Sequence, residues 1–207
     1  MRVLRIESVC EPFSDPRPGW LAARIVAFTS TVGLLTTPFR TLDPKSWEGV
    51  IASLREAGLL SASPFIGKPR LKQPSPEAFA NELRQLYETI EESPIPVKEW
   101  KPMREALGDE LLVRFLDISK PSLQRYASGE RKTPQDVAER LHALALIVSD
   151  LAGTYNEFGI RRWFERPRAQ LGERSPAAML KRGWKPDEEG ARRVRALAAS
   201  LWGAGAT

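Results

Sequence analysis

The sequence predicts a mainly α-helical protein, in which a helical bundle with a helix-turn-helix follows a small N-terminal helical domain. Three segments carry the start signal of a helix, a polar capping residue followed by proline, at Asp43-Pro44, Ser75-Pro76 and Thr133-Pro134. In each segment apolar residues then recur at spacings of three and four, which places them on one helix face. Of the 207 residues, 42% are hydrophobic, which is enough to build a packed core.

Residues 1–95 are expected to form one domain that begins with two helices. An apolar stretch predicts a helix over 20–28, followed by a β-branched or loop segment over 29–37. A second helix is expected to begin at Pro44 and to end at Gly58, because glycine commonly follows the last helical turn. Its buried stripe has the spacing i, i+3, i+4, i+7 and comprises Trp47, Val50, Ile51 and Leu54.

Residues 59–72 favour a short hairpin with a basic second arm. A helix followed by such a hairpin resembles a winged-helix module. The helix that would contact DNA is neutral, however, because two basic residues are balanced by two acidic ones. A domain that serves packing or dimerisation is therefore an equal alternative for residues 1–95.

A third helix is expected from Pro76 to about Glu92. Its apolar face comprises Phe79, Leu83, Leu86, Tyr87 and Ile90. This face can pack within its own domain or against a second copy in a homodimer, and the sequence leaves both open. The prolines in 93–96 favour an extended linker, because each biases its predecessor away from helix. We place the domain boundary near residue 95.

Residues 96–153 are expected to form the helix-turn-helix domain. A short helix over 102–107 is stopped at Gly108, Asp109 caps a helix over 110–116, and the turn 117–119 leads into a helix over 120–128. Two short helices joined by about three residues are typical of a helix-turn-helix. A longer helix then reaches about Leu151, with an inner face of Val137, Leu141, Leu144, Val148 and Leu151.

The helix over 120–128 is the expected DNA-reading helix. Leu112, Leu116, Ile118, Leu123 and Tyr126 would pack the two helices together. The residues left facing outward, with two cations just past the helix, are Ser119, Lys120, Gln124, Arg125, Ser128, Arg131 and Lys132. Lysine and arginine can bind guanine or phosphate, and glutamine can pair with adenine. The sequence therefore predicts DNA binding here, with a purely structural helix-turn-helix as the alternative.

The turn departs from the common pattern, which has glycine where this chain has Asp117. Aspartate tolerates the left-handed backbone conformation better than most residues, so the turn is expected to form. Its negative charge close to the DNA backbone is expected to weaken binding.

The positive charge of the chain is concentrated at its C-terminal end. Residues 1–95 and 96–150 each hold equal numbers of basic and acidic residues, whereas residues 151–207 hold 11 basic and 6 acidic ones, which accounts for the whole net charge of +5. Arginine suits bidentate contacts with anions. Aromatic residues rimmed by arginine are typical of interface hot spots. The candidate partner-binding residues are Arg161, Arg162, Trp163, Arg166, Arg168, Arg192, Arg193 and Arg195. The alternatives are a solvated basic face and, for Trp163 and Phe164, a place in the core.

Two blocks of sequence carry a family resemblance. Residues 111–119 (LLVRFLDIS) and 122–134 (SLQRYASGERKTP) resemble the Xre-type domain of the Xre/MbcA/ParS antitoxins. Residues 159–167 (GIRRWFERP), with Leu171-Gly172 and 175–180 (SPAAML), resemble the toxin-binding C-terminal domain of that family, here residues 154–207. The resemblance covers about half the chain, and residues 1–95 lie outside it.

The resemblance implies a cytoplasmic bacterial antitoxin that binds a cognate toxin, usually a RES-domain enzyme that consumes NAD. It also implies binding to the protein's own promoter and assembly as a homodimer. The alternative is a stand-alone DNA-binding transcription regulator, or another nucleic-acid-associated protein, built from the same domains. The long N-terminal domain favours this alternative, whereas the C-terminal block favours the antitoxin.

An enzyme is the least favoured class. The sequence has no glycine-rich phosphate loop, no paired metal ligands and no Cys/His or Ser/His arrangement, so no catalytic residue, metal or cofactor is expected. His142 is expected at the surface or in boundary packing. The single cysteine, Cys10, fits a reducing compartment, and the N-terminus has no apolar signal region. We therefore expect a cytoplasmic protein that does not bind membranes.

Overall fold

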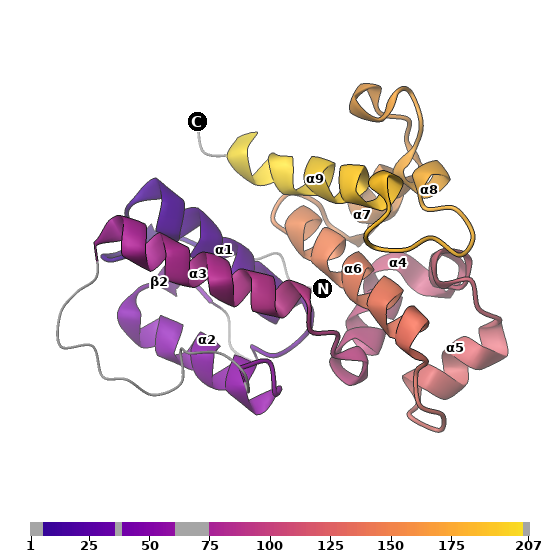
Figure 1. Cartoon of the computed structure of the whole chain (residues 1–207), viewed down its shortest axis with the longest axis horizontal. Helices are drawn as coiled ribbons and strands as arrows, with labels where there is room; N and C mark the ends of the chain where they lie inside the picture. The colour runs from indigo at the N-terminus through magenta and orange to yellow at the C-terminus, as the bar shows by residue number, and fades with distance from the viewer. Residues whose placement is uncertain (1–5, 36–38, 61–74, 205–207) are drawn as a thin grey trace. The chain divides into compact units, whose positions relative to one another are not determined.

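The computed structural model describes residues 6–35, 39–60 and 75–204, with the side chains of 202–204 left out. The fold is mainly helical, as the sequence predicts (Figure 1). The chain divides into two compact units, one up to Ser93 and one from Pro94 onward. The helices of the described residues are α1 (Pro16–Thr31), α2 (Pro44–Glu56), α3 (Pro76–Glu91), α4 (Pro96–Leu116), α5 (Lys120–Ala127), α6 (Gln135–Ala152), α7 (Glu157–Glu165), α8 (Pro176–Met179) and α9 (Glu189–Ala204).

The first unit is built on the packing of α1 against α3, which run side by side (Figure 1). Two of the three predicted caps are present, since Asp43 caps α2 in a capping box with Ser46 and Ser75 caps α3. The third is wrong, because Pro134 is the N-cap residue of α6 and no side chain caps that helix. All five residues of the predicted apolar face of α3 are buried. This apolar face therefore packs within its own unit, where α3 contacts α1.

Helix α1 is longer than predicted. It begins at Pro16 rather than at Trp20, because the carboxylate of Asp15 accepts the backbone N–H of Arg17 and caps it. The helix also continues to Thr31, into the segment expected to be β-branched or loop. The hydroxyl of Thr29 bonds back to the carbonyl of Ile25 at 2.9 Å, which satisfies this polar group inside the helix.

The described residues of this unit include a pair of short strands that the sequence did not predict. Within the described residues, β1 (Ser8–Val9) and β2 (Thr41–Leu42) pair in parallel, with Ser8 opposite Thr41 and Val9 opposite Leu42. The predicted hairpin over 59–72 falls almost wholly outside the described residues. Only its first two residues, Leu59 and Leu60, are described, and both are buried.

The second unit is built around α6, which packs against both α4 and α9. From Arg140 to Ala152 every residue of α6 is buried, not only the predicted inner face. A helix that is apolar nearly all round is typical of a core position. Helix α6 therefore forms the centre of this unit, and the helices around it carry its surface.

Helix α4 joins two predicted helices and begins earlier than expected. It starts at Pro96, where proline suits the first helical turn, and not at Pro102. At Gly108 the backbone has φ 79° and ψ 161°, so the helix is broken there as predicted. The two halves of α4, residues 96–107 and 109–116, therefore point in different directions around the kink.

In the C-terminal part of the chain, α7 and α9 pack against α6. Helix α7 packs on α4 and α8, and the short 3-10 helix η1 (Ala169–Leu171) contacts α9. Ser175 caps α8, since its hydroxyl accepts the N–H of Ala178. In the described ranges no helix combines the length and apolar character needed to cross a membrane.

Candidate nucleic-acid interface

The second half of α4 and helix α5 are held together by the residues predicted for this role. Leu112, Leu116, Leu123 and Tyr126 are buried, and Ile118 is half-buried. The ring of Tyr126 stacks on Trp100 of α4, with the ring centroids 6.2 Å apart. The orientation of α5 is therefore fixed by packing along one face, which leaves its other face to solvent.

The turn between these helices has the left-handed geometry expected of Asp117. Its φ is 53° and its ψ is 49°, and it is one of two non-glycine residues with positive φ in the described chain. Its carboxylate accepts the Nε–H of Arg182 at 2.7 Å. This ion pair places a positive charge beside the aspartate.

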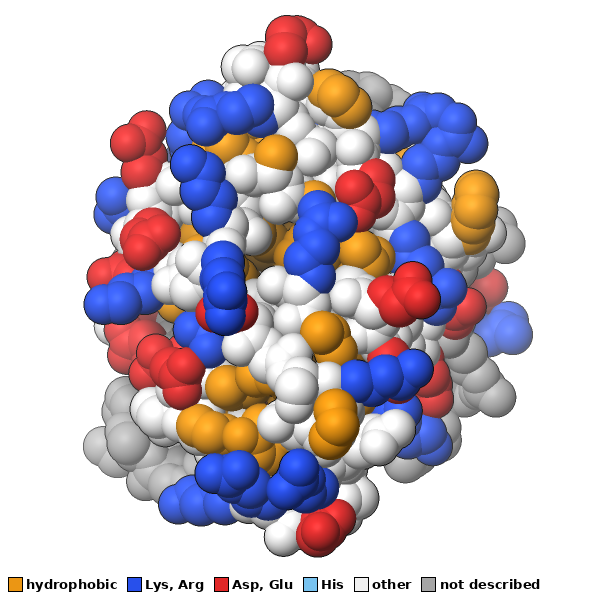
Figure 2. Space-filling model, turned by 90° about the vertical axis from the view of Figure 1, so that its right-hand side faces the viewer, with side chains coloured by type: hydrophobic (Ala, Val, Ile, Leu, Met, Phe, Trp, Pro, Cys, Tyr) orange, Lys and Arg blue, Asp and Glu red, His pale blue; other side chains and the backbone are white. Residues whose placement is uncertain are grey.

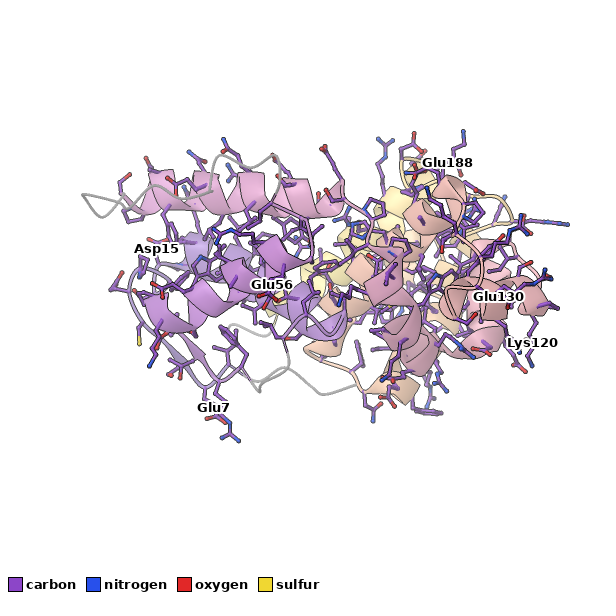
Figure 3. All side chains as sticks on the ribbon, turned by 90° about the horizontal axis from the view of Figure 1, so that it is seen from below. Glu7, Asp15, Glu56, Lys120, Glu130 and Glu188 are labelled. Carbon is purple, nitrogen blue, oxygen red and sulfur yellow. The ribbon has the colours of Figure 1, made fainter. Side chains whose placement is uncertain are left out.

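All seven predicted DNA-binding residues are exposed. Ser119 also has a structural task, because its hydroxyl caps α5 by accepting the N–H of Ser122 at 3.3 Å. Arg131 lies over the ring of Tyr126, with its Cζ 5.7 Å from the ring centroid. Lys120 projects from α5 at the edge of the unit (Figure 3). The structure thus brings these side chains to one exposed helix and the turn after it.

The face of the second unit that carries α5 and α8 is rich in cations. Figure 2 shows Lys and Arg side chains spread over this face, with hydrophobic, Asp and Glu side chains between them. Residues 120–132 contribute four basic groups against Glu130 alone. A positive surface of this kind attracts a polyanion at long range.

Arg161 has a structural role that sequence reasoning missed. Its guanidinium reaches from α7 to the kink in α4, where Nε donates to the carbonyl of Ala106 at 2.9 Å and the Nη2 atom donates to the carbonyl of Glu105 at 2.7 Å. The last carbonyls of a helix have no partner within the helix. Arg161 therefore caps the first half of α4, and its exposed side chain leaves its assignment as a partner-binding residue a prediction.

Replacing Arg161 by alanine is expected to lower the free energy of unfolding by about 1 kcal/mol, since two carbonyls lose a charged donor at a partly exposed position. Urea denaturation monitored by circular dichroism measures this loss. Arg162→Ala is the matched control, because Arg162 is the exposed neighbour on the same helix and should change stability by less than about 0.5 kcal/mol. Equal stabilities of the two variants would contradict the capping role.

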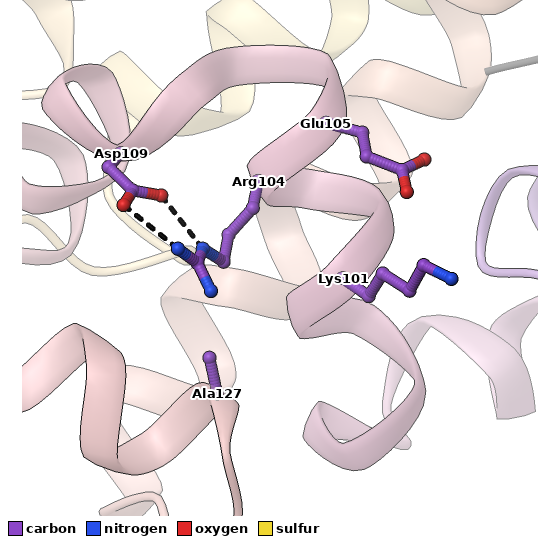
Figure 4. A pocket seen from close by; sticks show the side chains of 5 residues that line it. All are labelled: Lys101, Arg104, Glu105, Asp109 and Ala127. Carbon is purple, nitrogen blue, oxygen red and sulfur yellow. Dashed lines mark hydrogen bonds and ion pairs between the residues drawn. The ribbon is translucent and has the colours of Figure 1, made fainter.

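A hollow of about 330 Å³ lies beside the same kink, lined by Lys101, Arg104, Glu105, Asp109 and Ala127 (Figure 4). Within it the guanidinium of Arg104 makes two hydrogen bonds to the Asp109 carboxylate, at 2.8 and 2.9 Å. The Arg104 hydrogen bond holds the pKa of the Asp109 carboxyl below its usual range. Arg104 and Asp109 lie on either side of Gly108, so their two hydrogen bonds hold the halves of α4 together at the kink.

Trp163 is a core residue, so its assignment as a surface anchor is wrong. It is 2% exposed and lies edge-on to the ring of Phe164, with the centroids 5.2 Å apart. Arg168 stacks over its ring, with its Cζ 5.4 Å from the centroid. The alternative stated from the sequence, that Trp163 and Phe164 are core residues, describes both positions.

The remaining arginines of the predicted partner surface divide into two groups. Arg162, Arg166 and Arg192 are exposed. Arg168, Arg193 and Arg195 are half-buried, and Arg193 donates to the carbonyl of Gln170 at 3.1 Å. Only the first group is presented to a partner in full.

The exposed aromatic residue of this region is Phe158, which the sequence reasoning did not select. It is 70% exposed on α7. Arg162 lies four residues further along the same helix, so the two share one face. The exposure of Phe158 could have been predicted from its position outside the apolar stripe of Ile160, Trp163 and Phe164.

His142 is buried, whereas the sequence predicted a place at the surface or in boundary packing. It is 3% exposed, and its Nδ1 lies 2.5 Å from Oε1 of Glu99, which is fully buried. The pair joins α6 to the first half of α4. Among the described residues no group of three or more His, Cys, Asp or Glu side chains is placed to hold a metal ion.

Comparison with known proteins gives no match: no protein-family model, no curated protein and no solved structure is significantly similar to this chain.

Proposed function

We propose that this protein is a DNA-binding regulator whose helix α5 enters the major groove. The observation that carries the proposal is that α5 is fixed along one face by Leu123 and Tyr126, while every predicted base- or phosphate-contacting side chain on it is exposed. A helix that reads DNA needs this combination of a rigid anchor and free polar side chains.

Each exposed side chain has a defined task in the proposed complex. Gln124 pairs with adenine, and Arg125 binds guanine through its two hydrogen-bond donors. Lys120, Arg131 and Lys132 bind phosphates and set the position of α5 on the duplex. Ser119 and Ser128, at the two ends of α5, add hydroxyl groups near the backbone.

The test is a binding measurement by fluorescence anisotropy with the full chain and two labelled duplexes. One carries the sequence upstream of the protein's own gene, and the other is a shuffled duplex of the same length. We expect tighter binding to the first, and binding to both that weakens as salt rises, because phosphate contacts release counterions. Absence of binding to either duplex at low salt would overturn the proposal.

A second candidate function is binding of a partner protein, which the antitoxin resemblance implies to be a RES-type, NAD-consuming toxin. The observation that favours it is the exposed pair Phe158 and Arg162, with Arg166 close in sequence. An exposed aromatic side chain beside arginine has the composition of an interface hot spot. The two functions use different surfaces, so one chain can carry both.

Replacing Phe158 by alanine together with Arg162 by glutamate is expected to abolish a co-purified complex, with a loss of more than about 2 kcal/mol in binding free energy. Affinity purification from the native host with mass spectrometry identifies the partner, and titration calorimetry measures the loss. The matched control is Val97→Ala with Lys98→Glu, since Val97 is 89% exposed and Lys98 is exposed beside it. A complex that tolerates the first pair of changes would place the interface elsewhere.

A further inference from the structure

We propose that the segment 180–185, which belongs to the C-terminal region and not to the helix-turn-helix, is a second DNA-contacting element that binds the phosphate backbone beside α5. This inference rests on the proposed function. It assigns Lys181 and Arg182 to DNA, whereas the sequence pattern pointed to a protein partner for the C-terminal charge. The class of ligand is the phosphodiester backbone of a DNA duplex.

The segment is fixed rigidly to the end of α4. Trp184 is 2% exposed, and its indole N–H donates to the carbonyl of Phe115 at 2.7 Å. That carbonyl belongs to the last turn of α4, where carbonyls lack a helical partner. Leu180 is also buried, and Gly183 makes the turn between the two anchors with φ of +70°. The basic residues between these anchors are therefore held in one place.

Lys181 and Arg182 lie against the turn that leads into α5. Arg182 donates to the Asp117 carboxylate at 2.7 Å, yet 90% of its side chain is exposed. Lys181, Arg182 and Arg114 line a hollow of about 560 Å³ that also includes Asp117 and Ile118 of the turn. Because the turn immediately precedes Lys120, these cations extend the positive surface of α5.

The charge of the hollow fits an anion. Its lining contains three cations and one carboxylate, that of Asp117, which already has Arg182 as a partner. Arg114 is paired with Glu165 at 3.0 Å, but both side chains are about half exposed, so water screens the pair. A duplex seated on α5 brings its phosphates to the edge of this helix, where cations at fixed positions release counterions on binding.

The test compares the salt dependence of DNA binding in the full chain and two double variants. Lys181→Ala with Arg182→Ala removes two proposed phosphate contacts, and Lys98→Ala with Arg174→Ala removes an exposed lysine and an exposed arginine that lie outside the hollow. Plotted as log K against log [KCl], the first variant is expected to lose about two units of slope, with the base preference unchanged. The control variant is expected to keep the slope of the wild type.

A second variant, Lys181→Glu, leaves the Trp184 and Arg182 contacts in place, and we expect it to weaken binding without altering the circular dichroism spectrum. An unchanged slope in both variants of the segment, while wild type binds DNA, would overturn this inference alone. Loss of an acidic protein partner with an unchanged slope would also overturn it, in favour of a protein surface. Failure of the wild type to bind any duplex would remove the proposed function and this inference together.

Discussion

Replacing Lys120, Gln124 and Arg125 together by alanine is expected to lower the affinity for the preferred duplex by about 100-fold or more, because each good base contact contributes about 1–3 kcal/mol of discrimination. All three side chains are exposed, so the fold should be unaffected. Fluorescence anisotropy against the preferred and shuffled duplexes measures both affinity and preference.

The matched control removes the same three residue types elsewhere, as Lys98→Ala, Gln170→Ala and Arg192→Ala, which are likewise exposed. This control loses the same formal charge as the α5 variant. It should therefore show only the small, sequence-independent effect of lower net charge. A control that loses as much preference as the α5 variant would contradict the account, because the effect would then come from charge and not from α5.

Replacing His142 by leucine is expected to lower the free energy of unfolding by about 3 kcal/mol. The change removes the closest hydrogen-bond partner, at 2.5 Å, of a carboxyl group that is fully buried, and taking the side-chain partner from a buried ionisable group is strongly destabilising. Among the described residues Oε2 of Glu99 has no hydrogen-bond partner, and without His142 its Oε1 keeps only the long 3.5 Å hydrogen bond from the N–H of Ile95. Urea denaturation measures the difference.

The double variant Glu99→Leu with His142→Leu separates this effect from a simple packing defect. Removing both polar partners together is often much less costly than removing one, so the double variant is expected to be more stable than either single variant. The contradicting outcome is that the losses in the free energy of unfolding caused by Glu99→Leu and by His142→Leu simply add in the double variant. In that case the two residues act independently, and the pair does not hold α4 to α6.

Much of the fold could be predicted from short sequence signals that span only a few residues. A polar cap followed by proline marked the starts of α2 and α3, and Gly108 marked the kink in α4. The same signal at Asp15-Pro16 marks the start of α1, four residues before the predicted start at residue 20. The exposed face of α5 followed from the spacing of its apolar residues, since a short helix packed on one side has only one arrangement of faces.

Contacts between distant residues were not predictable. Arg161 caps a helix that ends 55 residues earlier, and Trp184 bonds to a carbonyl 69 residues earlier. His142 looked like a boundary residue because one helix face was taken as buried, whereas α6 is covered on all sides by other helices. These positions depend on which elements pack together, and the sequence of one element does not carry that information.

The most direct test of the central claim, that α5 reads DNA bases, is selection from a library of randomised duplexes followed by sequencing, done with wild type and with Gln124→Ala. The account predicts that wild type enriches one motif and that the variant loses its preference at a single position of that motif, an adenine. An identical motif from both proteins, or no motif from wild type, would contradict it.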